Sequence, residues 1–379
     1  MVNSVLAAVR VGPSKTEIRE YPMPDVPDDA ALMKMEVAGI CGTDVKLYKT
    51  PPTKSPVIMG HENIGIIAKA GREFTRRKGF KEGDLVFVEH YVACGKCEWC
   101  HLGQYRHCEN TDWRRNPDAI RYGYTSAEKA PHLWGGFAHY VYLPWNAVVH
   151  HVPKGVTPEL AGLVTPMANG VEWSLFDGGV GYNSTVLIQG PGQQGLSQTV
   201  ICKQAGAALI IVTGTSKDRA RMAVAKELGA DFTIDVEKED PLACIMEITA
   251  GKGVDVALDC TAGAGTIPIL LGVEALKRKG GTIVVGDARR IARGNGNSRF
   301  IAHAWTPVLY IGGTERLRER PVHSHGKSEA WITSGTPWPP TDLMARSTSL
   351  SPNLWVVTFS NGKRFEASCA RASSHALKL

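Results

Sequence analysis

The sequence predicts an α/β protein in which a doubly wound parallel sheet is joined to a second, β-rich domain. Two observations predict this fold class. Residues 1–152 contain short apolar runs separated by Gly, Pro and Asp, a pattern typical of many short strands. Residues 153–290 instead alternate strand-like and helix-like segments, which is typical of a parallel sheet covered by helices. A chain of 379 residues is long enough for two or three domains with their own cores.

In the first region, the apolar runs predict the strands of a barrel-like sheet. Each run is short and is bounded by residues that interrupt regular structure. The runs are SVLAAVRV (4–11), AALMKMEVAGI (30–40), ENIGIIAKAG (62–71), GDLVFVEHYV (83–92), GFAHYVYLP (136–144) and AVVHHVP (147–153).

In the second region, five strands and the helices between them can be placed one by one. One helix is expected up to Ala205, and another begins near Ser216 as N-cap and stops at Gly229. A third is expected over 238–249, and an apolar one reaches Lys279. The predicted strands are TVLIQ (185–189), LIIVT (209–213), DFTID (231–235), VDVALDC (254–260) and GTIVVG (281–286).

Residues 291–379 form a third region with a different composition. They are rich in Arg, Ser, Pro and Trp, and neither the helical nor the strand period persists in them. We consider three interpretations: a shifted reading frame in the source gene, a diverged but ordered ending, and a disordered extension.

Charge and cysteine usage limit the function classes. The net charge is +6, but residues 291–379 hold 11 Lys and Arg against 5 Asp and Glu, so the first 290 residues are neutral. This distribution argues against a nucleic-acid partner. No signal peptide or apolar run of about 20 residues is present, so we expect a cytoplasmic protein without a membrane partner. Nine clustered cysteines indicate metal ligands or buried thiols in a reducing compartment.

Four cysteines, Cys94, Cys97, Cys100 and Cys108, follow the spacing C-x2-C-x2-C-x7-C. Four thiolates on one short loop are typical of a closed, structural zinc site. Two alternatives are an iron–sulfur centre and thiols without metal. The long last gap, and Glu109 where bacterial ferredoxins have proline, disfavour the iron–sulfur centre.

A second candidate metal set is formed by Cys41 and His61. They lie in GICGTDVKLYK (39–49) and IMGHENIG (58–65). A thiolate and an imidazole are suitable zinc ligands, and a further ligand would come from elsewhere. Taken singly, each residue also has an ordinary structural interpretation, as a buried cysteine and a loop histidine.

The glycine-rich segment GPGQQG (190–195) predicts a dinucleotide site. It follows a predicted strand and opens a predicted helix, so Gly190, Gly192 and Gly195 would let a pyrophosphate approach the helix N-terminus. The second strand ends at Thr213, where an acidic residue would hold the 2′-hydroxyl of NAD.

The sequence distinguishes only slightly between the two nicotinamide dinucleotides, NAD and NADP. Without a carboxylate at Thr213, Ser216, Lys217 and Arg219 could serve a 2′-phosphate, which favours NADP slightly over NAD. The alternative is that Ser216 is only an N-cap and that the bases are solvated.

Taken together, these motifs resemble those of the zinc-containing medium-chain dehydrogenases and reductases, which include alcohol, polyol and threonine dehydrogenases. The matching segments are CGTD (41–44), GHE (60–62), the four-cysteine segment, GGFAHYV (135–141) and GPGQQG. The resemblance implies a GroES-like catalytic domain, a Rossmann nucleotide-binding domain and a homodimer or homotetramer. It also implies a zinc- and NAD(P)-dependent alcohol or polyol dehydrogenase with structural and catalytic zinc.

By the same resemblance, Cys41 and His61 bind the catalytic zinc, Glu62 is a ligand or lies close to one, and Thr43 passes the substrate proton. Two departures stand out. Thr165 occupies the place where many relatives supply a further ligand, and Lys46 replaces a histidine that ends a proton relay. The alternative function is a catalytically impaired dinucleotide-binding protein that retains only the structural zinc.

Overall fold

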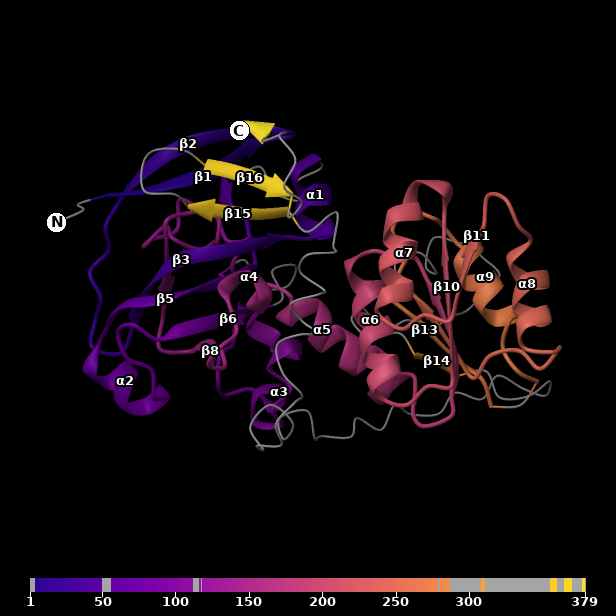
Figure 1. Cartoon of the computed structure of the whole chain (residues 1–379). Helices are drawn as coiled ribbons and strands as arrows, with labels where there is room; N and C mark the ends of the chain where they lie inside the picture. Colours follow the sequence, from indigo (N-terminus) through magenta and orange to yellow (C-terminus); the bar gives the residue numbers. More distant parts are fainter. Residues whose placement is uncertain are drawn as a thin grey trace. The chain divides into compact units, whose positions relative to one another are not determined.

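The computed structural model describes residues 4–49, 56–111, 116, 118–278 and 280–286, and the strand segments 308–310, 355–359, 365–369 and 377–378. The chain divides into two compact units (Figure 1). The first contains the residues up to Leu163 and the last three strands. The second begins at Val164.

The first unit is built on antiparallel sheets, as its apolar runs predict. An eight-stranded sheet has the order β17-β16-β15-β3-β5-β6-β8, with β7 also paired to β3, and a smaller sheet has the order β2-β1-β4. The strands are β1 Ser4–Gly12, β2 Lys15–Pro22, β3 Ala31–Ile40, β4 Val57–Ile58, β5 Glu62–Ala70, β6 Leu85–Val92, β7 Tyr140–Leu143, β8 Ala147–His151, β15 Trp355–Phe359, β16 Phe365–Cys369 and β17 Leu377–Lys378.

Each of the six apolar runs contains one of these strands, because alternate residues of the runs fill the core between the sheets. Met33, Met35 and Val86 are among the buried residues of that core. Sequence analysis missed the charged strand β2, whose alternation has few apolar residues, and it missed the short helices. These are α1 Gly42–Lys49, α2 Arg72–Lys78, α3 Glu98–His101 and α4 Pro158–Ala161, with 3-10 turns η1 Tyr105–His107 and η2 Glu109–Thr111.

The second unit contains a six-stranded sheet of order β11-β10-β9-β12-β13-β14. The first five strands are parallel and β14 runs antiparallel to β13. The strands are β9 Thr185–Gln189, β10 Leu209–Gly214, β11 Phe232–Asp235, β12 Val256–Asp259, β13 Thr282–Val285 and β14 Val308–Tyr310. All five predicted parallel strands are therefore confirmed.

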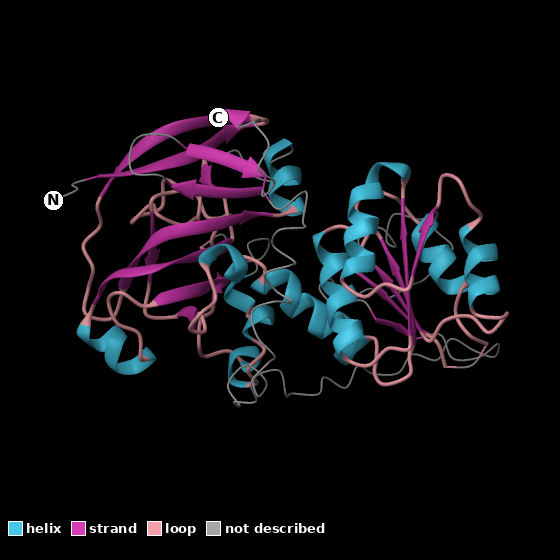
Figure 2. Cartoon of the chain, viewed as in Figure 1, coloured by secondary structure: helices cyan, strands magenta, loops and turns pink. Residues whose placement is uncertain are grey.

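Helices cover both faces of this sheet (Figure 2). Ile188 and Val212 face one core with Val200 and Val224, whereas Leu187 and its neighbours face another. Strand residues that are apolar on both faces produce this doubly wound arrangement. The helical segments are α5 Val164–Val171, η3 Glu172–Asp177, α6 Gln193–Gln204, η4 Ser216–Asp218, α7 Arg219–Glu227, α8 Pro241–Ile248 and α9 Ile267–Glu274.

Helix boundaries differ from the sequence predictions by a few residues. Thr215, rather than Ser216, is the N-cap before η4, because Thr215 and Asp218 form a capping box. The predicted helix over 238–249 begins only at Pro241, after the N-cap Asp240. The last predicted helix ends at Glu274.

The C-terminal region contributes strands to both units. Strand β14 pairs with β13, and β15 pairs with β3. The described residues do not include 287–307, 311–354, 360–364, 370–376 or 379. The three interpretations of residues 291–379 therefore concern a region that lies mostly outside the described residues. In the described part of the chain, no helix is long and apolar enough to cross a membrane.

Candidate active site and cofactor-binding turn

Cys41 lies where strand β3 ends and helix α1 begins. Its Sγ accepts a hydrogen bond from the Thr43 amide at 3.2 Å, and its own amide donates to Asp44 Oδ2 at 3.0 Å. The Asp44 carboxylate thus caps the backbone at Cys41, as the acidic residue of a capping box does, while Cys41 Sγ accepts from Thr43. The Thr43 and Lys46 side chains are exposed on the same helix.

His61 and Glu62 come from the start of β5, next to the end of β3. Gly60 has φ +89°, and a Cβ there would lie 2.7 Å from the Phe137 ring, so this turn needs glycine. The turn directs the buried His61 toward Cys41, and Cys41 Sγ lies 3.0 Å from His61 Nε2. The structure therefore brings together two residues that are twenty positions apart.

Asp44 holds the other side of the His61 ring. The buried Asp44 Oδ1 lies 3.2 Å from His61 Nδ1. Burial opposes protonation of His61, but the charges of Asp44 and Cys41 outweigh it and raise the pKa of the imidazole well above its ordinary value. Paired with Asp44 through Nδ1, the ring presents Nε2 to Cys41, which is the arrangement of a metal-ligating histidine. Sequence analysis quoted the CGTD motif without assigning this role to its aspartate.

Glu62 completes a three-residue cluster. Ligand atoms of Cys41, His61 and Glu62 lie within 4.8 Å of one another. Glu62 pairs with Gly39 across the β3–β5 ladder, and a Cβ at Gly39 would lie 2.2 Å from Glu62 Oε2. Glycine at position 39 thus makes space for the carboxylate. Sulfur, nitrogen and oxygen donors in this number suit zinc. Thr165 lies in the first turn of α5, in the second unit.

Aromatic and basic side chains that sequence analysis missed surround this cluster. The His61 ring centroid lies 5.4 Å from that of Tyr124 and 5.6 Å from that of His90. The Arg121 guanidinium lies between Tyr91 and Tyr124, 4.6 and 4.5 Å from the ring centres. Burial and the nearby charges of Arg121 and His61 hold the pKa of His90 well below its ordinary value.

The missed residues come from the end of β6 and from the segment after the cysteines. Tyr122 donates its amide to the His90 carbonyl, and Tyr91 bridges to Arg121. The only sequence signal for these residues was the dipeptide His90-Tyr91 just before the cysteine segment. No motif spacing links this dipeptide to Cys41 or His61, so the sequence alone could not assign it to the site.

The four cysteines of the 94–108 segment, hereafter the cysteine lobe, also come together, with their sulfurs within 4.8 Å of one another. Cys97 Sγ lies 3.5 Å from Cys100 Sγ, which lies 4.0 Å from Cys94 Sγ. Four sulfurs bound to one zinc at about 2.3 Å lie about 3.8 Å apart. The separations therefore fit a tetrahedral zinc site.

Backbone N–H groups prepare one sulfur of the lobe for a metal. Burial opposes ionisation of Cys94, but hydrogen bonds, first from the Lys96 amide, lower the pKa of its thiol to about 6. Burial and the neighbouring Cys97 raise the pKa of Cys100 to about 12. Among the four, only Cys108 is fully buried, so the lobe has little core of its own.

The glycine-rich turn follows β9 as predicted. Gly190 has φ +91°, and a Cβ at Gly195 would lie 2.0 Å from the Gly190 carbonyl oxygen. Gly192 is the N-cap of α6, and a Cβ on it would meet no atom within 4 Å. Tight packing at two glycines and open space at the third fit a pyrophosphate placed at the N-terminus of α6.

Thr213, Ser216 and Lys217 lie at or just beyond the carboxyl end of β10. Thr213 is buried and Lys217 is exposed. The Ser216 amide donates to Glu237 Oε2 at 2.9 Å, and its hydroxyl donates to Asp235 Oδ2 at 2.8 Å. Both Ser216 donors are therefore engaged by carboxylates, which weighs against the predicted use of Ser216 for a 2′-phosphate.

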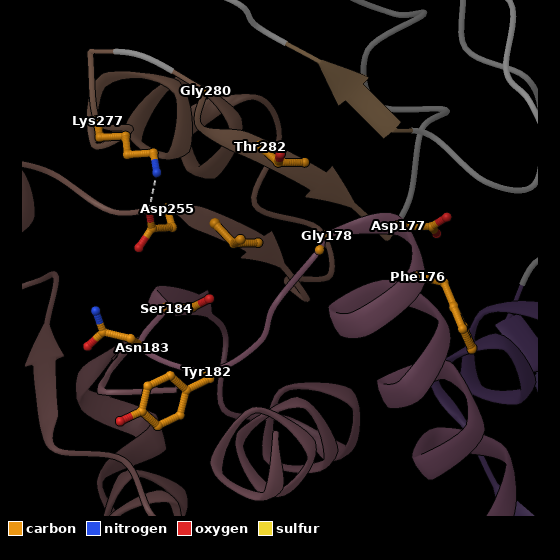
Figure 3. A pocket seen from close by; sticks show the side chains of 12 residues that line it. Phe176, Asp177, Gly178, Tyr182, Asn183, Ser184, Asp255, Lys277, Gly280 and Thr282 are labelled. Carbon is orange, nitrogen blue, oxygen red and sulfur yellow. Dashed lines mark hydrogen bonds and ion pairs between the residues drawn. The ribbon is translucent and has the colours of Figure 1, made fainter. Parts of the chain in front are cut away.

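A pocket of about 520 Å³ lies at the opposite, amino end of the parallel strands (Figure 3). Asp255 and Lys277 form an ion pair in it, and Asp255 Oδ2 accepts a hydrogen bond from the Thr185 amide at 2.8 Å. Dinucleotides bind at the carboxyl ends of such strands. We therefore do not assign this pocket to the cofactor.

Two family models match the chain. One, the alcohol dehydrogenase GroES-like domain, covers residues 27–154. The other, zinc-binding dehydrogenase, covers residues 195–296.

Two bacterial relatives align with most of the chain. A protein of Mycobacterium tuberculosis named "probable alcohol dehydrogenase" is 36% identical over 292 residues, which cover 76% of this chain and 77% of the relative. A sorbitol dehydrogenase of Halalkalibacterium halodurans is 31% identical, with 74% and 76% covered.

Solved structures of dehydrogenases are also similar to most of the chain. The alcohol dehydrogenase of Thermotoga maritima is 27% identical with a TM-score of 0.63, covering 73% of this chain and 76% of that one. Benzyl alcohol dehydrogenase from Acinetobacter calcoaceticus is 29% identical with a TM-score of 0.63, covering 74% and 76%. A zinc-binding dehydrogenase from Sinorhizobium meliloti, solved with NADP, is 26% identical with a TM-score of 0.62, covering 74% and 76%.

Proposed function

Because the chain belongs to the zinc-containing medium-chain dehydrogenase and reductase family, we propose that it transfers a hydride between an alcohol or polyol, or the derived carbonyl compound, and NAD(P). The observation that carries this proposal is the convergence of Cys41, His61 and Glu62 on one point. The cysteine lobe forms a second, separate set. A chain that needed zinc only to hold a loop would require only the lobe.

In this proposal, Cys41, His61 and Glu62 hold the catalytic zinc, and Cys94, Cys97, Cys100 and Cys108 hold the structural zinc. When bound, the catalytic zinc supplies a Lewis acid that stabilises negative charge on the substrate oxygen. Asp44 holds the His61 ring through Nδ1 and keeps Nε2 directed at the metal position. The Thr43 hydroxyl, on the exposed face of α1, accepts the proton that the substrate alcohol loses.

Lys46 replaces the histidine that ends the proton relay in many relatives. It lies on α1, and its side chain is exposed. An exposed ammonium group can exchange a proton with water directly. We therefore propose that Lys46 connects the Thr43 relay to solvent.

The cofactor part of the proposal rests on the turn Gly190–Gly195 and on the residues beyond β10. The nicotinamide ring supplies the hydride chemistry, and the glycine-rich turn and the N-terminus of α6 hold the pyrophosphate. The slight sequence preference for NADP rested on Thr213 and on Ser216, Lys217 and Arg219. The hydrogen bonds of Ser216 to Asp235 and Glu237 count against it, and the choice is argued further below.

We keep the domain limits proposed from the sequence, with the GroES-like catalytic domain at 1–152 and the nucleotide-binding domain at 153–290. We also propose a cytoplasmic homodimer or homotetramer acting on small molecules. None of the eight cysteines whose side chains the structure describes forms a disulfide, which supports a reducing compartment.

The second candidate function is that of a dinucleotide-binding protein with only the structural zinc. Thr165 favours it, because a neutral hydroxyl is a poor replacement for a carboxylate or thiolate ligand. One experiment separates the two functions: an absorbance screen at the NADH and NADPH band with a panel of alcohols, polyols and aldehydes in the presence of zinc. Zinc-dependent turnover of one substrate class supports the dehydrogenase. Dinucleotide binding without turnover across the panel supports the second function.

A further inference from the structure

The carboxyl end of β10 is the place where a dinucleotide's adenosine ribose would meet this chain. In proteins with this turn, a group near the end of the second strand contacts the 2′ position. A Cβ at Gly214 would lie 3.0 Å from Pro191 Cγ and 3.2 Å from Asp218 Cβ. Pro191 of the glycine-rich turn and Asp218 of the segment after β10 therefore both lie close to Gly214, the last residue of β10.

Hydrogen-bond donors of Thr215 and Ser216, directly after β10, are held by carboxylates. The Thr215 amide and hydroxyl donate to Asp218 Oδ2 at 3.1 and 2.8 Å. The Ser216 amide and hydroxyl donate to Glu237 and Asp235 at 2.9 and 2.8 Å. A phosphate bound here could accept hydrogen bonds from Thr215 and Ser216 only by displacing these carboxylates.

Two of the carboxylates come from the neighbouring strand β11 and the turn that follows it. Asp235 is the last residue of β11, in register with Gly214 of β10, and Glu237 follows in the next turn. Hydrogen bonds from Lys238 and Ser216 lower the pKa of Asp235, and they outweigh desolvation, which acts to raise it. Asp235 is thus an anion at neutral pH.

The nearest basic groups on the following elements are also engaged. Lys238 Nζ lies 2.8 Å from Asp235, and Arg221 Nη1 lies 2.7 Å from Asp218. Lys217 and Arg219 are exposed. Two of the four basic groups of this region, Lys238 and Arg221, therefore pair with its own carboxylates.

We propose that Asp235 and Glu237, acting through Ser216, make the chain selective for a dinucleotide with a free 2′-hydroxyl over one with a 2′-phosphate. The proposal rests on the proposed dinucleotide-binding function. A 2′-hydroxyl can donate to a carboxylate, whereas a 2′-phosphate would meet two anions and no free donor on Ser216. Discrimination by repulsion of the wrong ligand is an effective source of specificity. The acidic groups reach the site from β11 and not from the end of β10, where sequence analysis looked for them.

The test measures the dissociation constants of NAD+ and NADP+ for the full-length protein by isothermal titration calorimetry. The variants are Asp235→Asn, Glu237→Gln and the double variant, which remove charge and keep side-chain size. Glu247→Gln, an exposed carboxylate on α8, is the matched control. Circular dichroism and thermal midpoints verify that each variant is folded.

We expect the wild-type protein and the control to bind NAD+ about 100-fold more tightly than NADP+. We expect the double variant to bind NADP+ about tenfold more tightly than the wild type does, with NAD+ affinity changed less than about threefold, since a tenfold change is the scale of one weakened charge contact. The fragments 5′-ADP and 2′,5′-ADP should show the same order.

Tighter binding of NADP+ than NAD+ by the wild type would overturn the selectivity and leave dinucleotide binding intact. An unchanged NAD+/NADP+ ratio in a folded double variant would overturn the roles of Asp235 and Glu237. Failure of the folded wild type to bind any of the four ligands would instead refute the proposed function, and this inference with it.

Discussion

The cysteine lobe and the Cys41–His61–Glu62 cluster use the same kinds of donor atom but are assembled differently. The lobe takes its four sulfurs from one continuous segment, next to the partly exposed Trp99 and the exposed Leu102. The second cluster takes its ligands from the start of α1 and the start of β5, and His61 and Glu62 are buried. It depends on the β3–β5 ladder.

This difference indicates which site would hold a structural metal and which would hold a catalytic one. Four thiolates close a coordination sphere and leave no position for substrate. Three ligands of mixed type leave a position open. Beside this cluster, Tyr124 and His90 pack against the His61 ring, and Arg121 lies over the Tyr124 ring. The lobe is therefore suited to hold a loop, and the second cluster is suited to chemistry.

The largest expected effect is on turnover. Cys41→Ala and His61→Ala should each lower kcat/KM by about 1000-fold or more, because a Lewis acid contributes several kcal/mol to the stabilisation of developing charge. NAD(P) affinity should stay within about threefold of the wild type, measured by calorimetry. Turnover that stays within tenfold of the wild type in both variants would show that this cluster is not the catalytic centre.

The next largest effect concerns stability. Cys100→Ser should release the lobe zinc and lower the thermal midpoint by about 10 °C, because structural zinc contributes several kcal/mol to folding. Activity per folded molecule should fall much less than in the Cys41 and His61 variants. The comparison fails if Cys100→Ser abolishes turnover in a protein that keeps its secondary structure and its thermal midpoint.

Much of this fold could be predicted from the sequence, because the patterns that specify it lie within short segments of the chain. The parallel strands β9, β10 and β13 are short apolar runs next to or ending in glycine, and the cysteine lobe has ligand spacings that one loop can satisfy without a core. Cys41 and His61 could be paired only through the resemblance to a family, because their contact depends on the register of β3 and β5.

Other parts of the site depend on tertiary contacts that carry no sequence period. Arg121 meets Tyr91 through an isolated bridge between loops. Ser216 was predicted as an N-cap, but Thr215 takes that place. As a result Ser216 is left to donate to Asp235 and Glu237, a contact that requires β10 and β11 to be adjacent.

A smaller effect is expected at Asp44, which links the two ligand-bearing segments. Asp44→Asn should weaken zinc binding at the second cluster by about 10- to 100-fold, the usual cost of losing a partner of a ligating histidine. Zinc in the lobe should be unaffected. Competition with a chromophoric chelator resolves the two sites. Equal weakening of both sites, or of neither, would contradict the role of Asp44.

The most direct test of the central claim is the zinc content of the purified full-length protein, measured by inductively coupled plasma mass spectrometry. The wild type should hold two zinc ions per chain. His61→Ala should hold one zinc ion and be inactive, and Cys100→Ser should also hold one but keep activity in the fraction that folds. A wild type with a single zinc ion, lost in Cys100→Ser and retained in His61→Ala, would contradict the assignment of a catalytic centre at Cys41, His61 and Glu62.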